Sequence, residues 1–252
     1  MAIIIGQLTP EGTGGINTYK AGVYTIHEFS STGTFTPAQN TRVDILAIGG
    51  GGYRGFSDPP SSTGSGGGGG AVMVTKFVPM NSGLGYTMTV GGRNGNTIAN
   101  YEGGSLPAPA GAPGVPGSSG SLPGNSAPLA SGSGGTGWSA ANGGAGANIA
   151  GQGFPGFRDA GGGNSSPSGA GGGAGSGGPV TTVSSNGGSG TPLAYFTGIT
   201  THTNAAAGGP GRGGDQTPRP GIQYGNGGGA NGAGSDEGTQ PAQPGAIFIR
   251  YI

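Results

Sequence analysis

Runs of glycine are the feature that most restricts how this chain can fold. Four glycines stand together at Gly49–Gly52 and five at Gly66–Gly70, and the 252 residues include 67 Gly and 20 Pro. In a helix interior, Gly costs about 1 kcal/mol and Pro about 3 kcal/mol relative to Ala. The two residue types make up about 35% of the chain, above the roughly 25–30% typical of low-complexity sequence. This composition excludes an ordinary enzyme domain and predicts no helix in the glycine-rich part.

The small number of charged residues narrows the choice of partners. Nine Lys and Arg balance nine Asp and Glu, and charged residues are only 7% of the sequence. Nucleic-acid-binding proteins carry basic patches, so we expect no nucleic acid partner. No apolar stretch approaches the ~20 residues of a membrane-spanning helix, and the first residues lack the basic leader and apolar core of a signal peptide. We therefore expect neither membrane insertion nor a secretion signal.

Residues that usually carry catalysis or bind metals are scarce. The chain has no Cys, which excludes disulfides, thiol nucleophiles and Cys-ligated zinc. A Ser/His/Asp hydrolase would need His27 or His202 as its base, but His27 falls inside a predicted strand and His202 lies in a polar loop. Neither Lys20 nor Lys76 follows Gly, as the lysine of a phosphate-binding loop does. We expect no enzymatic activity, no catalytic residue, no cofactor and no metal site.

Large apolar side chains are concentrated at the two ends of the chain. Leu, Ile, Val and Phe account for 21 of the first 101 residues, 13 of the next 144 and four of the last seven. Short runs of β-branched and aromatic residues bounded by Gly, Pro and Asn are typical of strands joined by turns. On this basis we predict five strands, at Val23–Phe29, Val43–Ile48, Ala71–Val78, Tyr86–Val90 and Ala246–Ile252.

The predicted strands differ in the faces that they bury. Val43–Ile48 is apolar at five of six positions and is expected to be buried on both faces. In Ala71–Val78, alternation places Val72, Val74 and Val78 with Lys76 on one face, and Met73 and Phe77 on the other. The last strand must pair with the early strands, because the residues between them offer no partner strand. The glycine-rich segment is then an insertion anchored at both ends.

The glycine-rich insertion needs a structure that uses bare backbone. A three-residue glycine period at Gly111–Gly120 fails by Leu122, and the longer glycine runs obey no collagen repeat. What remains is polyglycine II, an extended left-handed helix with three residues per turn. Because glycine lacks a Cβ, neighbouring helices can touch and exchange N–H···O=C bonds, supplemented by weak Cα–H···O contacts.

Five sequence segments in a fixed order point to a family. They are HEFSSTGTFTP at His27–Pro37, VDILAIGGGG at Val43–Gly52, GGGGGAVMV at Gly66–Val74, YTMTVGG at Tyr86–Gly92 and AIFIRY at Ala246–Tyr251. Together they resemble the glycine-rich domain of many bacteriophage tail-fibre and tail-tip proteins, including polyglycine II adhesins of T-even-like phages. The resemblance implies an all-β fold, in which an antiparallel, jelly-roll-like β-sandwich is closed by the carboxyl-terminal strand and carries an inserted polyglycine II helix bundle.

The resemblance also implies a division of the chain. Residues 21–101 together with 246–252 would form the β-sandwich, with a glycine-rich excursion at 49–70. Residues 102–245 would form the polyglycine II insertion with its loops. Residues 1–20 fall outside the resemblance and could attach the protein to another virion protein.

The function that the resemblance implies is that of a virion protein made in the host cytoplasm. A tail-fibre or tail-tip component would contact other virion proteins and bind a bacterial surface receptor, either lipopolysaccharide or an outer-membrane protein, as a homo-oligomer with a trimer favoured. Two alternatives stay open. One is a purely structural role as a head-decoration fibre or tail connector. The other is an ice-binding or matrix protein, which also could stack polyglycine II helices.

Aromatic residues in the glycine-rich sector are the candidates for receptor contact, since aromatics and Arg are favoured at recognition hot spots. The best candidates lie in the loops Gly153–Asp159 and Leu193–Asn204. The alternative is that these aromatic side chains are apolar plugs that fill space between the bundle and the sandwich. The candidate residues are Trp138, Phe154, Phe157, Arg158, Tyr195, Phe196, His202 and Tyr224.

Overall fold

The computed structural model describes residues 11–55, 66–114, 190–201, 205–207, 224–227 and 241–252. Within these ranges the protein is an antiparallel β structure with one short helical turn, so the expected all-β class is confirmed. The elements are β1 (Asn17–Ala21), β2 (Tyr24–Phe29), β3 (Gly33–Phe35), β4 (Thr41–Ile48), β5 (Val72–Met80), β6 (Tyr86–Thr89), β7 (Thr97–Tyr101), β8 (Gly104–Ala108), α1 (Ala194–Thr197) and β9 (Ala246–Tyr251).

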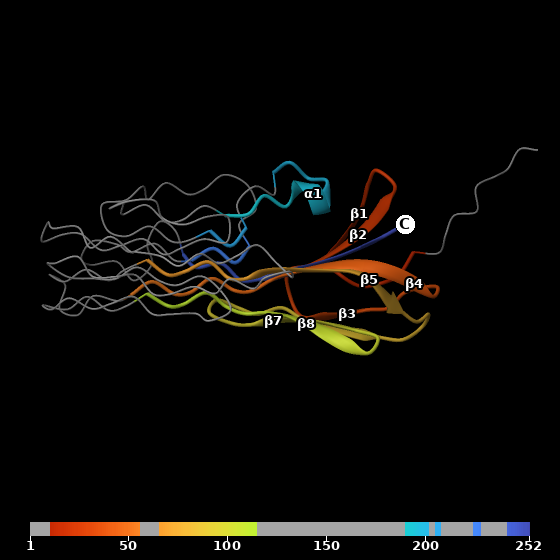
Figure 1. Ribbon diagram of the computed structural model, residues 1–252, viewed down its shortest axis with the longest axis horizontal. Helices are drawn as coiled ribbons and strands as arrows, with labels where there is room; N and C mark the ends of the chain where they lie inside the picture. Colours follow the sequence, from red (N-terminus) through yellow and green to blue (C-terminus); the bar gives the residue numbers. More distant parts are fainter. Residues whose placement is uncertain (1–10, 56–65, 115–189, 202–204, 208–223, 228–240) are drawn as a thin grey trace, which may run out of the picture.

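The larger sheet has five strands in the order β1-β2-β9-β4-β5 (Figure 1). Strand β9 lies between β2 and β4 and pairs antiparallel with both, so that Ile249 stands opposite His27 on one side and Ile45 on the other. The prediction that the last strand pairs with the early strands is therefore confirmed. All five predicted strands are present, with ends that shift by one or two residues.

The smaller sheet has four strands in the order β3-β6-β7-β8, and three of these the sequence does not predict. Strand β3 has three residues, and β8 contains Pro107 opposite Ile98 of β7. Proline is tolerated in β8 because this is an edge strand, where a missing N–H leaves no ladder bond unmade. Residues 104–108, which the sequence analysis placed in the insertion at 102–245, thus form an edge strand of the smaller sheet.

The expected attachment segment, 1–20, also overlaps the sheets. Strand β1 pairs with β2 from Asn17↔Glu28 to Ala21↔Tyr24, and Thr13 forms an isolated antiparallel bridge with Thr36. Strand β1 escaped prediction because it is a polar edge strand, with most of its side chains exposed. The described part of this segment, residues 11–20, is built into the two-sheet body.

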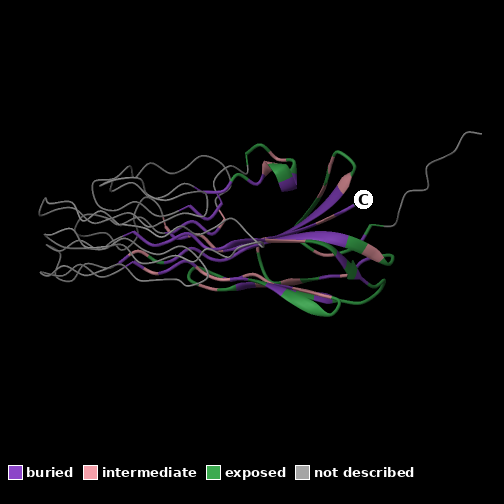
Figure 2. Cartoon of the chain, in the orientation of Figure 1, coloured by how far each residue is buried: buried purple, intermediate pink, exposed green. Residues whose placement is uncertain are grey.

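A shared hydrophobic core lies between the two sheets, and Figure 2 shows its buried strands. The five-stranded sheet contributes residues such as Phe29, Ile45 and Ile249, and the four-stranded sheet contributes Met88 and Leu106. The other face of the five-stranded sheet is also apolar, as expected for Val43–Ile48, and it is covered by residues from 190–201 and 205–207. Strand β4 is therefore buried on both faces, with its last six residues buried.

A β-bulge changes the expected facing of β5. Two residues, Lys76 and Phe77, fit opposite Asp44, and the register shifts between Val43 and Ile45. Phe77 takes a φ of 56° and leaves its side chain 67% exposed. After this extra residue Val78 packs in the core with Met73. The prediction that Val78 shares a face with Val72 and Val74 was wrong, because strict alternation holds only where no residue is inserted.

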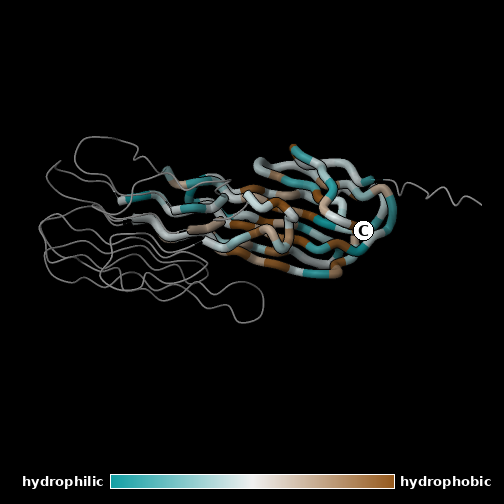
Figure 3. Tube along the Cα trace, turned by 90° about the horizontal axis from the view of Figure 1, so that it is seen from above, coloured by the Kyte–Doolittle hydropathy of each residue, from teal (hydrophilic) through white to brown (hydrophobic). Residues whose placement is uncertain are grey.

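Beyond one end of the two sheets, several chain segments run on side by side without strand pairing (Figures 1 and 3). We call these the glycine-rich segments; they comprise residues 49–55, 66–71, 91–96, 109–114, 224–227 and 241–245. Figure 3 shows hydrophobic residues gathered in the sheets and few in these segments. Packing there cannot depend on large side chains.

Backbone hydrogen bonds join the glycine-rich segments to several neighbours at once. Gly49 N–H donates to Ala71 O, Gly50 to Gly95 O, Gly51 to Gln243 O and Gly52 to Gly68 O, each at 2.9 Å. Successive residues of one segment thus donate to three different segments, unlike a strand, which pairs with at most two.

The glycine-rich segments approach closely enough to exclude any side chain at the contacts. A Cβ built on Gly51 would lie 1.9 Å from Asn226 O, and one built on Gly69 would lie 1.9 Å from Ala206 O. Both clashes are with backbone, which has no rotamer to change. Glycine is required here by space.

Candidate functional site

The helical turn α1 sits on the outer face of the five-stranded sheet. Leu193 and Phe196 enter an apolar cluster that includes Ile26, Leu46 and Phe248 of β2, β4 and β9. Phe196 is 2% exposed. The turn ends at Gly198, whose φ of 69° lets its N–H donate to Ala194 O at 2.8 Å, a left-handed cap that favours glycine. This turn corrects the expectation that the glycine-rich part contains no helix.

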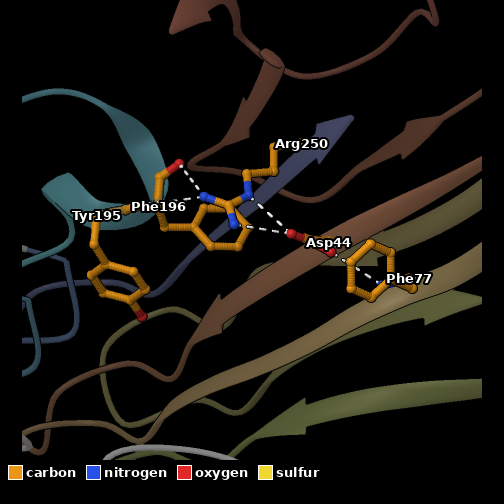
Figure 4. A network of polar contacts seen from close by, with 5 residues as sticks. All are labelled: Asp44, Phe77, Tyr195, Phe196 and Arg250. Carbon is orange, nitrogen blue, oxygen red and sulfur yellow. Dashed lines mark hydrogen bonds and ion pairs between the residues drawn. The ribbon is translucent and has the colours of Figure 1, made fainter. Parts of the chain in front are cut away.

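Arg250 of β9 fastens α1 to the sheet (Figure 4). Its Nε and Nη2 donate to Asp44 Oδ2 at 3.1 and 3.0 Å, and Nη1 donates to the backbone oxygens of Tyr195 and Phe196 at 3.2 and 3.3 Å. The guanidinium also lies 4.3 Å from the centre of the Phe196 ring and 4.7 Å from that of Tyr24. Such a planar, multiply bonded arrangement suits Arg and not Lys.

Asp44 completes this network from β4. Its Oδ1 accepts the backbone N–H of Phe77 at 3.1 Å, and both Asp44 and Arg250 side chains are only about an eighth exposed, at 12% and 13%. The bulge in β5, the ion pair and α1 are therefore parts of one connected structure. A partly buried ion pair that satisfies its donors in this way fixes geometry more than it adds stability.

Tyr195 is the one described candidate residue that faces solvent. Its side chain is 51% exposed, while its backbone oxygen is held by Arg250 and its ring meets Phe196 edge-on at 6.4 Å. The ring thus stands on a fixed support. A rigid aromatic ring loses little conformational entropy on binding, which is the property expected of a contact residue.

Tyr224 packs inward, from a glycine-rich segment onto the sheet. Its ring meets Phe248 edge-on at 5.8 Å, and its hydroxyl donates to Glu28 Oε1. Burial raises the pKa of Tyr224 above its ordinary value, and the Glu28 carboxylate raises it further. Like Phe196, it packs against the outer face of the five-stranded sheet.

The remaining candidates lie outside the described residues: Trp138, Phe154, Phe157, Arg158 and His202. The structure thus brings Phe196 and Tyr224 into one apolar cluster on the sheet and leaves Tyr195 on its surface.

Arg250 and Asp44 were not predicted from the sequence. Each is the only charged residue in a run that otherwise reads as a strand, AIFIRYI and VDILAI. Opposite charges in two strands expected to be buried were a usable signal that these strands are neighbours, because a buried charge needs a partner.

Within the described ranges, no group of three or more His, Cys, Asp or Glu could hold a metal ion. In the same part of the chain, no helix has the length and apolar character needed to cross a membrane.

A family model described as a glycine-rich domain matches residues 29–252, which is most of the chain. The chain belongs to this glycine-rich domain family. The match begins at the last residue of β2, so β1 and nearly all of β2 precede the matched glycine-rich domain while completing its larger sheet. No curated protein matches the chain.

Proposed function

We propose that the glycine-rich segments form a polyglycine II helix bundle inserted into a jelly-roll-like β-sandwich. The observation that carries this proposal is a three-residue period in hydrogen-bond direction. Gly49 and Gly52 donate to the same segment, 66–71, while Gly50 and Gly51 donate elsewhere. A helix with three residues per turn points in the same direction at every third residue.

The same period recurs in two other segments. Gly68 and Ala71 both donate to 109–112, with bonds of 2.8 and 2.9 Å, and Gly111 and Gly114 both donate to 50–53, with bonds of 2.9 and 2.6 Å. Three independent repeats of the period support helices over irregular loops.

On this architecture we propose a bacteriophage virion protein, a tail-fibre or tail-tip component that binds the host cell surface. The resemblance of the sequence supports the affiliation, and the geometry supports rigid display. Residues 11–14 and the end of β9 lie at the opposite end of the sheets from the glycine-rich segments (Figure 1). Attachment at one end would leave the other free to meet a lipopolysaccharide or an outer-membrane protein.

Rigid display would lower the entropy lost on binding, because a contact residue would be held in place before it meets the receptor. Tyr195 supports this proposal best among the described candidates, since it is exposed on a backbone that Arg250 holds in place.

The test is adsorption of particles that carry Tyr195→Ala, compared with particles that carry Leu84→Ala. Both side chains are 51% exposed, but Leu84 lies in the β5–β6 turn, away from α1. We expect Tyr195→Ala to slow adsorption about tenfold or more, the loss typical of a hot-spot residue, and Leu84→Ala to leave it unchanged. Equal adsorption by both variants and the parent would contradict a receptor role for this surface.

A structural virion role is the second candidate, and it is favoured by the inward packing of Phe196 and Tyr224. Copy number separates the two roles, since a head-decoration protein is present in many more copies than a fibre tip. Antibody labelling of intact particles in the electron microscope, with quantitation of the chain per particle, would decide between them. Absence of the chain from particles would contradict both.

A further inference from the structure

The segment before β1 closes one side of the two-sheet body, and it does so through few contacts. We call residues 11–16 the strap. It crosses from the edge of the four-stranded sheet, where Thr13 and Thr36 exchange backbone bonds of 2.8 and 2.9 Å, to the five-stranded sheet, where Ile16 N–H donates to Glu28 O at 2.8 Å. Only these three backbone bonds join the strap to the sheets within the described residues.

The fit of the strap requires glycine at three positions. A Cβ on Gly12 would lie 2.9 Å from the Phe35 ring, and one on Gly14 would lie 2.1 Å from Thr34 O at a φ of +116°. Gly15 has a φ of +88° and would meet Glu28 O at 2.8 Å. The three glycines of EGTGG therefore let the strap lie directly against the sheets.

The side chains of His27 and Tyr251 form hydrogen bonds with the backbone of the strap. His27 Nδ1 lies 2.7 Å from Gly14 O, His27 Nε2 lies 3.0 Å from Tyr251 Oη, and the N–H of Gly12 donates to the same Oη at 2.8 Å. His27 is 1% exposed, with its ring against Phe35 at 5.0 Å and stacked on Tyr251 at 5.8 Å. The imidazole is thus enclosed by the strap and by two aromatic rings.

These contacts fix the protonation of His27. A carbonyl oxygen only accepts, so Nδ1 must carry the proton that Gly14 receives. In the neutral ring Nε2 then accepts, and the Tyr251 hydroxyl donates to it while accepting from Gly12. Every group in this chain of three bonds is satisfied in one arrangement, the neutral Nδ1–H tautomer.

A second proton on His27 disrupts that arrangement. Nε2–H would meet the hydroxyl proton of Tyr251, and Tyr251 Oη has only His27 and Gly12 as partners among the described residues. The hydroxyl must then rotate so that its oxygen accepts from Nε2–H, and this weakens the hydrogen bond that the same oxygen accepts from Gly12 N–H. The imidazolium would also be a buried charge, whose cost falls when water reaches it.

The charged groups around His27 do not supply a counter-ion in the closed strap. Glu11 of the strap and Lys20 of β1 pair with each other at 2.6 Å, with both side chains about half exposed. Thr18 of β1 adds only a hydroxyl, 3.1 Å from Nδ1. Burial lowers the pKa of His27 below its ordinary 6.5, more than the Gly14 carbonyl and Glu11 raise it, and Lys20 lowers it further.

We propose that residues 11–16 form an acid-released strap, which opens when His27 takes up a second proton while the strands stay paired. Opening exposes the Phe35 ring at the side of the core and leaves Thr36 without its partner Thr13. It also frees the chain before β1 to extend from the body. The inference is independent of the proposed virion role, because it rests on the strap alone.

The direction of the pH effect follows from proton uptake. The open strap leaves His27 in water with its ordinary pKa near 6.5, and the closed strap holds a lower pKa. The open state therefore binds more protons as the pH falls below about 6.5, and the opening equilibrium rises by up to about tenfold per pH unit for one proton.

Hydrogen exchange on the intact chain tests this directly. After correction for the intrinsic pH dependence, peptides covering 11–16 should lose protection between pH 7.5 and 5, while peptides from β4 and β9 keep theirs. Glu11→Gln should retain this response, because it removes only the exposed ion pair. His27→Gln should abolish it, because the side chain no longer titrates.

Nitrogen chemical shifts of His27 give a second readout that needs no variant. The expected result at pH 7.5 is the Nδ1–H tautomer, with protonation only below pH 6.5. An Nε2–H tautomer would overturn the proposal, as would strap protection that does not change down to pH 5. Loss of protection in β4 and β9 together with the strap would overturn it too, since that is global unfolding.

Discussion

The two-sheet body and the glycine-rich segments solve the same packing problem by opposite means. Between the sheets, large side chains such as Phe29 and Met88 fill the space, and the backbones stay apart. In the glycine-rich segments the backbones touch, and a single added methyl group at Gly51 would strike a peptide oxygen. One region is sensitive to the loss of atoms and the other to their gain.

The strand termini show how the chain passes from one regime to the other. Strands β4 and β5 pair up to Ile48 and Val72, and the next residues, Gly49 and Ala71, are still joined by a bond from Gly49 N–H to Ala71 O. Gly50 and Gly51 then donate to other segments, and Gly52 donates to the 66–71 segment again. The transition needs no linker, because extended backbone serves both arrangements.

The largest expected effect is loss of atoms from the side-chain-packed region. Phe248→Ala removes a fully buried ring of β9 that packs against the ring of Tyr224. It should lower the free energy of unfolding by about 3–5 kcal/mol. Urea unfolding measures the change. Phe77→Ala is the matched control, since that ring is 67% exposed, and it should stay within about 0.5 kcal/mol. Similar losses in both variants would break the distinction between the regions.

Gain of atoms in the backbone-packed region comes next. Gly51→Ala should destabilise by about 1–3 kcal/mol, because the new Cβ meets backbone that cannot rotate away. Gly92→Ala is its control, because no atom lies within 4 Å of the added Cβ, and the smaller conformational entropy of the unfolded chain favours Ala by up to about 1 kcal/mol. Thermal unfolding compares the two. Unchanged stability in Gly51→Ala would mean that the neighbouring backbone can move aside to make room for the added Cβ.

The smallest effect is expected at α1, on the outer face of the five-stranded sheet. Arg250→Lys keeps the charge but loses the paired bonds to Asp44 and the stacking on Phe196, which should cost about 1 kcal/mol. Faster hydrogen exchange at α1 should accompany it. Arg42→Lys, on an exposed arginine that donates to Phe77 O at 3.2 Å, should change stability little. An unaltered α1 in Arg250→Lys would show that apolar packing alone holds the turn.

Much of the sheet could be predicted because its strands are apolar and well bounded. That β9 pairs with the early strands followed from elimination, since the glycine-rich residues before it offered no predicted strand. Strands β1 and β8 could not be found that way. Both are edge strands: β1 is polar and β8 contains Pro, so neither has the apolar pattern that marks a buried strand.

The candidate site was harder to predict for a related reason. Composition marks Tyr195, Phe196 and Tyr224 alike as aromatics among glycines, but which of them faces solvent depends on the tertiary path of the chain. Likewise, the bulge at Phe77 depends on Asp44 in a neighbouring strand. Alternation within one segment carries no information about such an insertion.

The central place of β9 has a consequence for how the molecule is made. The hairpins β1–β2 and β4–β5 are complete early in synthesis, but each keeps an open edge until residues 246–251 arrive to join them. Because a ribosome adds residues in order, some 140 residues are translated after β8 while these two edges wait. A chaperone or a neighbouring chain can contact these open strand edges during that interval, so the protein is most vulnerable while it is being synthesised.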